Sequence, residues 1–214
     1  MSPEPTSAPR RTYDASRRRE SARRNRLAVL EAGRELLLRD GYQATTIRAV
    51  AERAGVSPDT VYKTFGDKRR LMKAVYDVAL AGDDEPVPIG RRPAVRAAFT
   101  AAHPAEKIEL YARFVAELME RIGGLLTVLT GADPELAAVR EDTEDERRVG
   151  VGAFVAHLKE HDLLTSPLPM EHVIDACWAL TSPHLYAQLR YAREWSGEQY
   201  RQWLAAMLGA TLRP

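Results

Sequence analysis

The chain has 214 residues, with 31 Lys and Arg, 30 Asp and Glu and a single cysteine. Its 45% apolar and 29% charged residues are typical of a globular protein, so a wholly disordered chain is excluded. One cysteine excludes a disulfide framework and a cysteine-based zinc site, and it suits a reducing compartment. Every apolar run is shorter than the about 18 residues that span a membrane, and the Pro-, Ser- and Arg-rich start lacks the apolar segment of a secretion signal. We therefore expect a cytoplasmic protein with no membrane partner.

Charge is unevenly distributed along the chain. Residues 1–80 hold 17 Lys and Arg against 10 Asp and Glu, a net charge of +7. Residues 81–214 hold 14 against 20, a net charge of −6. A basic first third followed by an acidic remainder indicates a part that binds a polyanion and a second part with another role.

The first 20 residues contain five arginines, three prolines and one aromatic residue. Such a segment buries too little apolar surface to offset its loss of conformational entropy, so residues 1–20 are expected to form a flexible basic arm. Its arginines suit either contacts with DNA phosphates and the minor groove or a purely solubilising role, and the sequence leaves both open. A helix is expected from Ser21 to Asp40-Gly41.

Two short helices, 46–54 and 58–64, are predicted next, followed by a helix over 68–81. Gly55 stands where the first needs a left-handed C-terminal residue, and the Ser57-Pro58 pair favours the start of the second. Two short helices joined by a tight glycine-containing turn indicate a helix-turn-helix unit, in which the flanking helices supply the core. The second short helix has a polar outer face with basic residues around it, which favours DNA binding over a plain helical scaffold.

Residues 82–92 are rich in Gly, Pro and charge and are expected to separate two parts of the chain. Only helical patterns follow, and no segment alternates in the manner of a strand. Pro183 is expected to kink one of these helices, because a proline ring clashes with the carbonyl group four residues earlier. The helices are predicted over 93–101, 105–130, 134–163, 171–193 and 197–212. The fold class is therefore predicted to be all-α, with an N-terminal three-helix helix-turn-helix domain and a C-terminal helical bundle.

The run TTIRAVAERAGVSPDTVYKTFGDKRRLMKAV, residues 45–75, resembles the DNA-binding segment of the tetracycline-repressor (TetR) family of bacterial transcription regulators. The likeness rests on the Thr46-Ile47 start, on the spacing that leads to Ala54-Gly55-Val56-Ser57, and on Thr60-Val61-Tyr62 with Phe65, Lys68 and Leu71 after it. The resemblance implies a DNA-binding domain with a linking fourth helix over 21–81. It also implies an effector-binding and dimerisation domain over 82–214.

The resemblance further implies that helix 58–64 is the recognition helix and lies in the major groove of double-stranded DNA. Tyr62 is implied to touch a phosphate or a thymine methyl group, with a half-buried core ring as the alternative. Lys68, at a helix start, can hold a phosphate together with helix N–H groups. The predicted DNA-binding residues are Thr46, Arg48, Ser57, Asp59, Thr60, Tyr62, Lys63 and Lys68. Ser57 and Asp59 can instead serve only as helix caps.

The last two predicted helices resemble, more loosely, the pair through which TetR-type proteins form homodimers. The predicted dimer-interface residues are Leu185, Leu189, Tyr200, Trp203, Leu204 and Met207. Aromatic residues gather in the middle of the second part, and the family's effector pocket lies among such helices. Tyr111, Phe114, Phe154 and Trp178 are therefore predicted to bind a hydrophobic or aromatic effector. Packing in the chain's own core is the alternative for both sets.

Other chemistry receives little support from the sequence. His157 and His161 have the spacing of metal ligands on a helix, but Leu158 stands where the zinc-protease pattern has its glutamate, and two half-exposed histidines are the simpler interpretation. Cys177 has no basic neighbour in sequence and fits a small buried apolar residue better than a nucleophile. Gly123-Gly124, unexpected inside a helix, either bends it or leaves room for a ligand. No catalytic residue, metal site or cofactor is predicted.

The sequence thus predicts a sequence-specific DNA-binding transcriptional regulator, most simply a homodimeric repressor released from an inverted-repeat operator by a small ligand. It would be bacterial, and nucleoid-associated when bound to its operator. An activator or an effector-independent DNA binder is an alternative of the same class. An all-α enzyme that depends on a metal or small molecule and carries a basic head is the alternative from another class.

Overall fold

The structure of the chain is a computed structural model that describes residues 10–85, 87–130 and 134–213. Within these ranges all regular secondary structure is helical, which confirms the all-α prediction. The chain divides into two compact units, Met1–Val75 and Tyr76–Pro214, and each is described separately. No helix in the described part of the chain combines the length and apolar character needed to cross a lipid bilayer.

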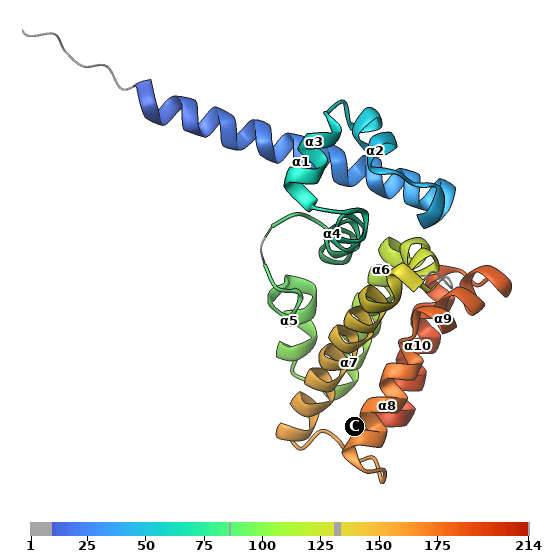
Figure 1. Cartoon of the computed structure of the whole chain (residues 1–214). Helices are drawn as coiled ribbons and strands as arrows, with labels where there is room; N and C mark the ends of the chain where they lie inside the picture. The colour runs from blue at the N-terminus through green and yellow to red at the C-terminus, as the bar shows by residue number, and fades with distance from the viewer. Residues whose placement is uncertain (1–9, 86, 131–133, 214) are drawn as a thin grey trace, which may run out of the picture. The chain divides into compact units, whose positions relative to one another are not determined.

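The first unit consists of α1 (Arg10–Ala44), α2 (Ile47–Ala54), α3 (Pro58–Phe65) and the first half of α4 (Lys68–Ala81) (Figure 1). Helical geometry in α1 is interrupted at Gly41, whose φ of 77° and ψ of 176° favour glycine, so the predicted stop at this residue is confirmed. The core of the unit is formed by one face of each helix and includes Val29, Leu37, Val50, Ala51, Val61, Phe65, Leu71 and Met72, all buried.

The structure differs from the prediction of a flexible arm over residues 1–20. Residues 1–9 lie outside the described part, and residues 10–20 form the first three turns of α1 instead of a flexible segment. The physical reason is local, because no Pro or Gly follows Pro9 in this stretch and its Arg, Ala and Glu residues have good helix propensities. Once the buried part of α1 has nucleated, adding turns at its N-terminus costs little.

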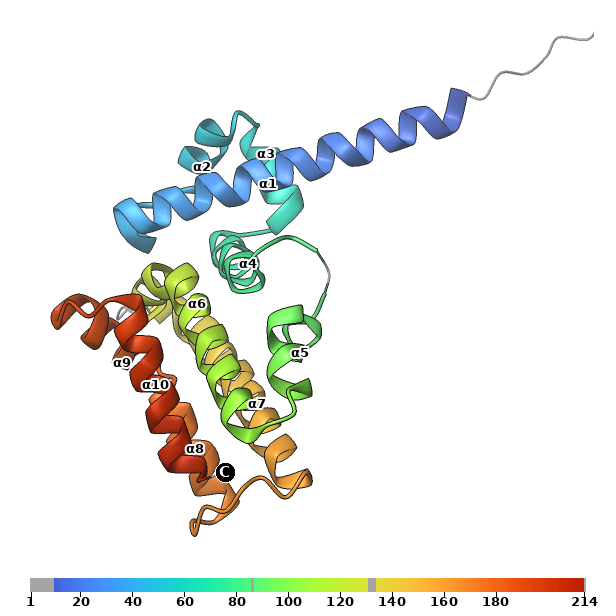
Figure 2. The same ribbon diagram turned by 180° about the vertical axis from the view of Figure 1, so that it is seen from behind.

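The second unit contains the end of α4 and five longer helices: α5 (Pro93–Thr100), α6 (Pro104–Thr130), α7 (Ala137–Glu160), α8 (Met170–Leu180) and α10 (Gly197–Leu212). Shorter helical segments are η1 (Ile89–Arg91), η2 (Pro134–Leu136), α9 (Pro183–Ala187) and η3 (Gln188–Ala192). Helix α6 packs against α5 on one side and α10 on another, while α8 packs against both α7 and α10 (Figure 2). This arrangement places α6 at the centre of the unit.

The single helix predicted over 171–193 is divided in the structure. Helix α8 ends at Leu180, and Ser182 begins α9 by accepting a hydrogen bond from the backbone N–H of His184, with Pro183 in the first helical position. Pro183 therefore starts a new helix, rather than kinking a continuous one, because Ser182 offers an N-terminal cap immediately before it. The next segment, η3, has the wider turn of a π-helix.

Gly123 allows α9 to approach α6 closely. A Cβ atom at this position would lie 2.9 Å from Cε1 of Tyr186 and 3.2 Å from the hydroxyl oxygen of Tyr191. Tyr186 is fully buried and makes an edge-to-face contact with Tyr200, with ring centroids 4.9 Å apart. The glycine therefore makes room for a protein side chain, which is neither the helix bend nor the room for a ligand that the sequence suggests for this position.

Candidate nucleic-acid interface

The turn between α2 and α3 is built by local hydrogen bonds. Thr46 caps α2 by accepting from the backbone N–H of Ala49 at 3.1 Å. Gly55 ends this helix with a φ of 68°, and its N–H donates to the carbonyl groups of Ala51 and Glu52. Ser57 then begins α3 by accepting from the backbone N–H of Thr60 at 3.2 Å. These caps fix the two short helices in the relation of a helix-turn-helix unit.

Helix α3 has a buried and an exposed side. Val61 and Phe65 are buried against the rest of the unit. Tyr62 is 53% exposed, so about half of its surface is open to solvent, which favours an outward-facing ring over a core ring. Asp59 and Lys63 are also exposed, and no described residue pairs with the side chain of either. An aromatic hydroxyl, a carboxylate and an ammonium group therefore stand together on one helix surface.

Ser57 and Thr60 are partly committed to the fold. Their hydroxyl oxygens lie 2.9 Å apart and are hydrogen-bonded to each other, in addition to the cap that Ser57 makes. Ser57 is exposed and Thr60 is half-buried. Each hydroxyl keeps further lone pairs, so contact with a second molecule is compatible with these bonds.

Lys68 lies at the start of α4 and is held in place by Tyr42. Its Nζ donates to the carbonyl oxygen of Tyr42 at 3.0 Å and lies 3.9 Å from the centroid of the Tyr42 ring. The lysine is half-buried, so its ammonium group is positioned in advance instead of moving freely in solvent. Arg48, at the start of α2, is exposed. Both cations stand beside helix N-termini, where backbone N–H groups favour an anionic partner.

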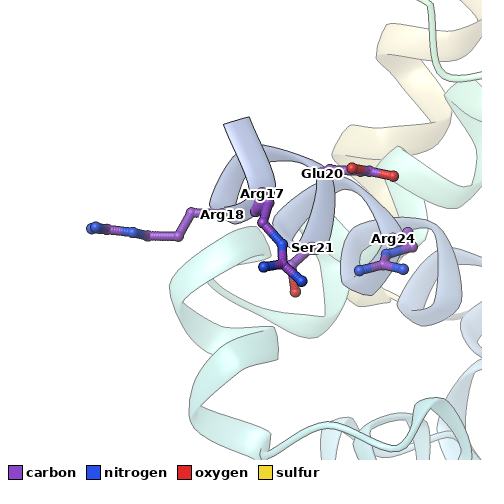
Figure 3. A pocket seen from close by; sticks show the side chains of 5 residues that line it. All are labelled: Arg17, Arg18, Glu20, Ser21 and Arg24. Carbon is purple, nitrogen blue, oxygen red and sulfur yellow. The ribbon is translucent and has the colours of Figure 1, made fainter. Parts of the chain in front are cut away.

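The exposed N-terminal part of α1 adds further cations to this unit. A shallow hollow on its surface is lined by Arg17, Arg18, Glu20, Ser21 and Arg24 (Figure 3). In the figure the Arg18 side chain extends away from the helix, whereas the side chains of Arg17 and Arg24 lie over the helix in this view. Positively charged side chains of the first unit therefore lie on the surface of α1 as well as around α3.

The N-terminal unit also matches a known family in sequence. A family model described as bacterial regulatory proteins, tetR family, matches residues 29–75, which span the end of α1 to the middle of α4. Over this segment, the chain is similar to the tetR family. The match includes all eight predicted DNA-binding residues of the chain.

Individual transcriptional regulators are also similar to parts of the chain. The HTH-type transcriptional repressor KstR of Rhodococcus jostii is 32% identical over 120 residues, which cover 56% of this chain and 51% of that protein. The uncharacterized HTH-type transcriptional regulator YvkB of Bacillus subtilis is 40% identical over 47 residues, covering 22% of this chain and 25% of that protein. The chain therefore spans about half or less of the length of these relatives.

Solved structures of bacterial regulators share the fold over most of the chain. NalD, the secondary repressor of the MexAB-OprM multidrug efflux pump in Pseudomonas aeruginosa, has a TM-score of 0.68 at 20% identity and covers 90% of this chain and 98% of its own. A putative tetR-family regulator from Syntrophomonas wolfei has a TM-score of 0.70 at 13% identity, covering 87% and 94%. At these identities the likeness concerns the fold alone.

The predicted effector-binding residues fall into two groups in the second unit. Tyr111 of α6 and Phe154 of α7 are buried and stacked, with ring centroids 4.0 Å apart and 3° between the planes, and Phe114 lies beside Tyr111 at 6.3 Å. Trp178 of α8 instead contacts Arg147, whose guanidinium carbon lies 4.4 Å from the indole centroid. The indole Nε1 of Trp178 is buried without a hydrogen-bond partner in the described structure. A buried donor that no protein group satisfies is compatible with a ligand or water beside it.

The predicted dimer-interface residues differ in exposure. Tyr200 and Leu204 are fully buried within the single chain, so we correct their assignment to the core, because neither side chain offers surface to a second protomer. Leu185, Leu189 and Trp203 are half-buried, and Met207 is 37% exposed. These four residues therefore leave apolar surface on α9, η3 and α10.

The histidine pair at the end of α7 lies in a different setting from a metal site. The rings of His157 and His161 have centroids 4.3 Å apart, and Nδ1 of His161 is hydrogen-bonded to the carbonyl oxygen of His157 at 2.8 Å. Among the described residues, no three His, Cys, Asp or Glu side chains gather closely enough to hold a metal ion. The pair instead borders a buried lysine, Lys107, that the sequence analysis does not single out.

The signal that would have identified Lys107 is its register. Lys107, Tyr111 and Phe114 are spaced i, i+4 and i+7, so a lysine occupies the apolar stripe of α6. Arg121, also on α6, has no comparable signal in the sequence. Its guanidinium donates to the carbonyl oxygens of Ala79 and Leu80, each at 3.3 Å, and so satisfies the C-terminal end of α4.

Proposed function

We propose that the chain is a sequence-specific DNA-binding transcriptional regulator that inserts α3 into the major groove of double-stranded DNA. The observation that carries the proposal is the outward side of α3, where Asp59, Tyr62 and Lys63 are exposed while Val61 and Phe65 fix the helix from behind. Base edges in the major groove present donors and acceptors that such short polar side chains can read. The match to the tetR family over residues 29–75 supports the same docking.

In this docking the residues have two kinds of role. Lys63, Asp59, Thr60 and Ser57 face base edges, and Tyr62 faces a phosphate or a thymine methyl group. Thr46, Arg48 and Lys68 bind phosphates at the two helix N-termini. Because Tyr42 already positions the Lys68 ammonium, this contact requires little further ordering of the side chain.

The role of Lys68 is tested by the salt dependence of DNA binding. Lys68→Ala is expected to weaken binding to all DNA sequences and to reduce the slope of log affinity against log salt by about one. Lys159→Ala, which removes an exposed lysine of α7, is the matched control and should leave the slope unchanged. An unaltered affinity of Lys68→Ala at every salt concentration would contradict the docking.

Base selection is tested separately. Substitutions at Lys63 or Thr60 are expected to change which sequences a random-DNA selection recovers, because each side chain that reads a base supplies about 1–3 kcal/mol of discrimination against the wrong base. Lys63→Ala is the cleaner of the two, since no described residue pairs with its side chain. If both variants recovered the same preferred DNA sequence as the wild type, α3 would contact DNA without reading its bases.

We further propose that the chain acts as a homodimer on an inverted-repeat operator, through the apolar surface left by Leu185, Leu189, Trp203 and Met207. Two heads related by a two-fold axis reach successive major grooves about 34–36 Å apart. Met207→Glu is expected to give monomers in sedimentation velocity without unfolding, because Met207 is 37% exposed in the single chain. A wild-type chain that sediments as a monomer at micromolar concentration would refute the dimer.

The regulator is proposed to be a repressor that a small apolar or aromatic ligand releases from DNA. Its place in the cell is then the cytoplasm, on the nucleoid when bound to its operator. The ligand would act near Tyr111, Phe114, Phe154 and Trp178. Within the second unit, Arg121 joins α6 to the end of α4, and α4 continues without interruption into the DNA-binding unit. This path connects a ligand-induced shift of α6 to the docking of α3.

Release is measured by titrating ligand in the presence and absence of operator DNA. A coupling of about 1–3 kcal/mol lowers operator affinity about 5–150-fold, and DNA must weaken ligand binding by the same factor. A ligand that binds equally well in both titrations cannot shift the equilibrium, and that result would refute induction while leaving DNA binding intact.

A further inference from the structure

Lys107 is the one charged side chain that is buried among the described residues, with 5% of its surface exposed. It belongs to the first turns of α6, where the positive end of the helix dipole disfavours a cation. A buried charge is costly unless it is paired with an opposite charge and hydrogen-bonded. In the described part of the chain no carboxylate pairs with Lys107.

The partners that Lys107 does have are dipoles only. Its Nζ donates to the carbonyl oxygen of Phe99 at 2.5 Å, in the last turn of α5, and lies 3.1 Å from Nε2 of His157 on α7. The carbonyl explains how the lysine helps to end α5, but it supplies no full negative charge. An ammonium group has three N–H donors, so these two contacts leave one donor available.

The two residues that bind this ammonium group belong to a cluster of aromatic rings. The Phe99 ring contacts His157 with centroids 4.8 Å apart and Phe154 at 5.7 Å, and Phe154 stacks on Tyr111. Phe99 and His157 are half-buried, whereas Tyr111 and Phe154 are buried. The cluster therefore reaches from the surface between α5 and α7 into the core, with the cation near its outer end.

We propose that Lys107 and His157 bind the carboxylate of a small amphipathic ligand whose apolar part lies against Phe99, Phe154 and Tyr111. The inference rests on the proposed function and specifies the chemistry of its effector. A monocarboxylate matches the single ammonium charge, and one of its oxygens can accept the remaining N–H of Lys107. Its apolar part gains by leaving water among aromatic rings.

The titration of His157 supports the same site. Burial in the first place, and then the charges of Lys107 and His161, lower the pKa of His157, while the Phe99 carbonyl and Glu160 act in the opposite direction. A bound carboxylate places a negative charge beside the imidazole, which favours its protonated form. Ligand binding is therefore expected to raise the pKa of His157.

The test uses the full chain and a series of phenylalkanoates and straight-chain alkanoates of increasing length, each paired with its neutral amide, in calorimetric titrations. The wild-type chain is expected to bind the best carboxylate about 10- to 100-fold more tightly than its amide. Lys107→Met should abolish this difference and Lys107→Arg should retain part of it. Lys159→Met, which removes an exposed lysine of the same region, should leave it unchanged. Equal affinity for acid and amide, no binding by any member of the series, or an unchanged preference in Lys107→Met would overturn the proposal.

Should Lys107→Met fail to fold, the wild-type chain still decides the question. The His157 titration, followed by NMR, is expected to move to higher pH with the carboxylate and to stay in place with the amide. An unmoved midpoint at saturating carboxylate would overturn the proposal. Failure of the proposed function has a different readout, namely the absence of salt-dependent, sequence-specific DNA binding, and carboxylate binding is measured without DNA.

Discussion

The contact between Gly123 and Tyr186 makes a matched pair of glycine substitutions informative. Gly123→Ala would place a Cβ atom 2.9 Å from Cε1 and 3.5 Å from Cδ1 of Tyr186. The ring is fully buried and enclosed by Tyr200 and Tyr191, with centroids 4.9 and 6.0 Å away, so it has little room to move. Gly150→Ala on α7 is the control, because nothing lies within 4 Å of its added Cβ and the residue is exposed.

The two substitutions share one energetic effect and differ in another. Each gains up to about 1 kcal/mol from the better helix propensity of alanine. Gly123→Ala alone also carries an overpacking cost of about 1–3 kcal/mol. Gly150→Ala is therefore expected to stabilise the chain, and Gly123→Ala to be less stable than Gly150→Ala by about 1–3 kcal/mol, which is the overpacking cost itself.

The free energy of unfolding is measured by urea denaturation of the wild type and both variants, followed by circular dichroism at a fixed protein concentration. A concentration series identifies any contribution from association. Equal stability of the two variants would refute the argument, since it would mean that Tyr186 yields without cost. The crowding at Gly123 would then have no structural role.

Two further predictions concern the second unit. Burial raises the pKa of Cys177 from its ordinary 9.0 to about 12, and its side chain is 1% exposed, so a disulfide reagent should label it only at the rate of unfolding. The raised pKa gives a stability contribution that is complete below pH 9 and is lost as pH rises towards 12. Cys177→Ala should therefore lose less stability above pH 9 than the wild type. Ser196 accepts a hydrogen bond from the N–H of Gln199 at 3.1 Å, and the Gln199 side chain accepts one from the N–H of Ser196 at 2.7 Å. Ser196→Ala should therefore lower the free energy of unfolding, measured by urea denaturation, by about 1 kcal/mol. A stability equal to that of the wild type would show that α10 begins without this cap.

The helix-turn-helix unit could be predicted from sequence because its determinants are local. Gly55, Ser57 and Pro58 each act on neighbours within four residues, and the structure has each of them in its predicted place at a helix end. The helix over 68–81 is likewise found with the predicted bounds. Sequence spacing carries this information because a cap, a left-handed glycine and an initial proline each allow few backbone conformations.

Features that depend on contacts distant in sequence could not be predicted in this way. The apolar stripe of the last helix is real, but periodicity cannot tell whether Tyr200 and Leu204 face the chain's own core or a second protomer. The register of Lys107 indicates its burial, but its partners cannot be read from the sequence, because one of them, His157, is fifty residues away. The helical start of α1 was missed because composition predicts a lack of core, which does not exclude an exposed helix.

Helix α3 separates the residues that maintain its shape from those that face outward. Val61 and Phe65 are buried and hold it in place, while Asp59, Tyr62 and Lys63 are exposed, and no described residue forms a hydrogen bond or ion pair with their side chains. Gene duplication could therefore change the outward side chains one at a time without compensating substitutions elsewhere. If α3 reads DNA as proposed, selection on folding and selection on recognition act on different side chains of the same eight-residue helix, so the target sequence can change without loss of the fold.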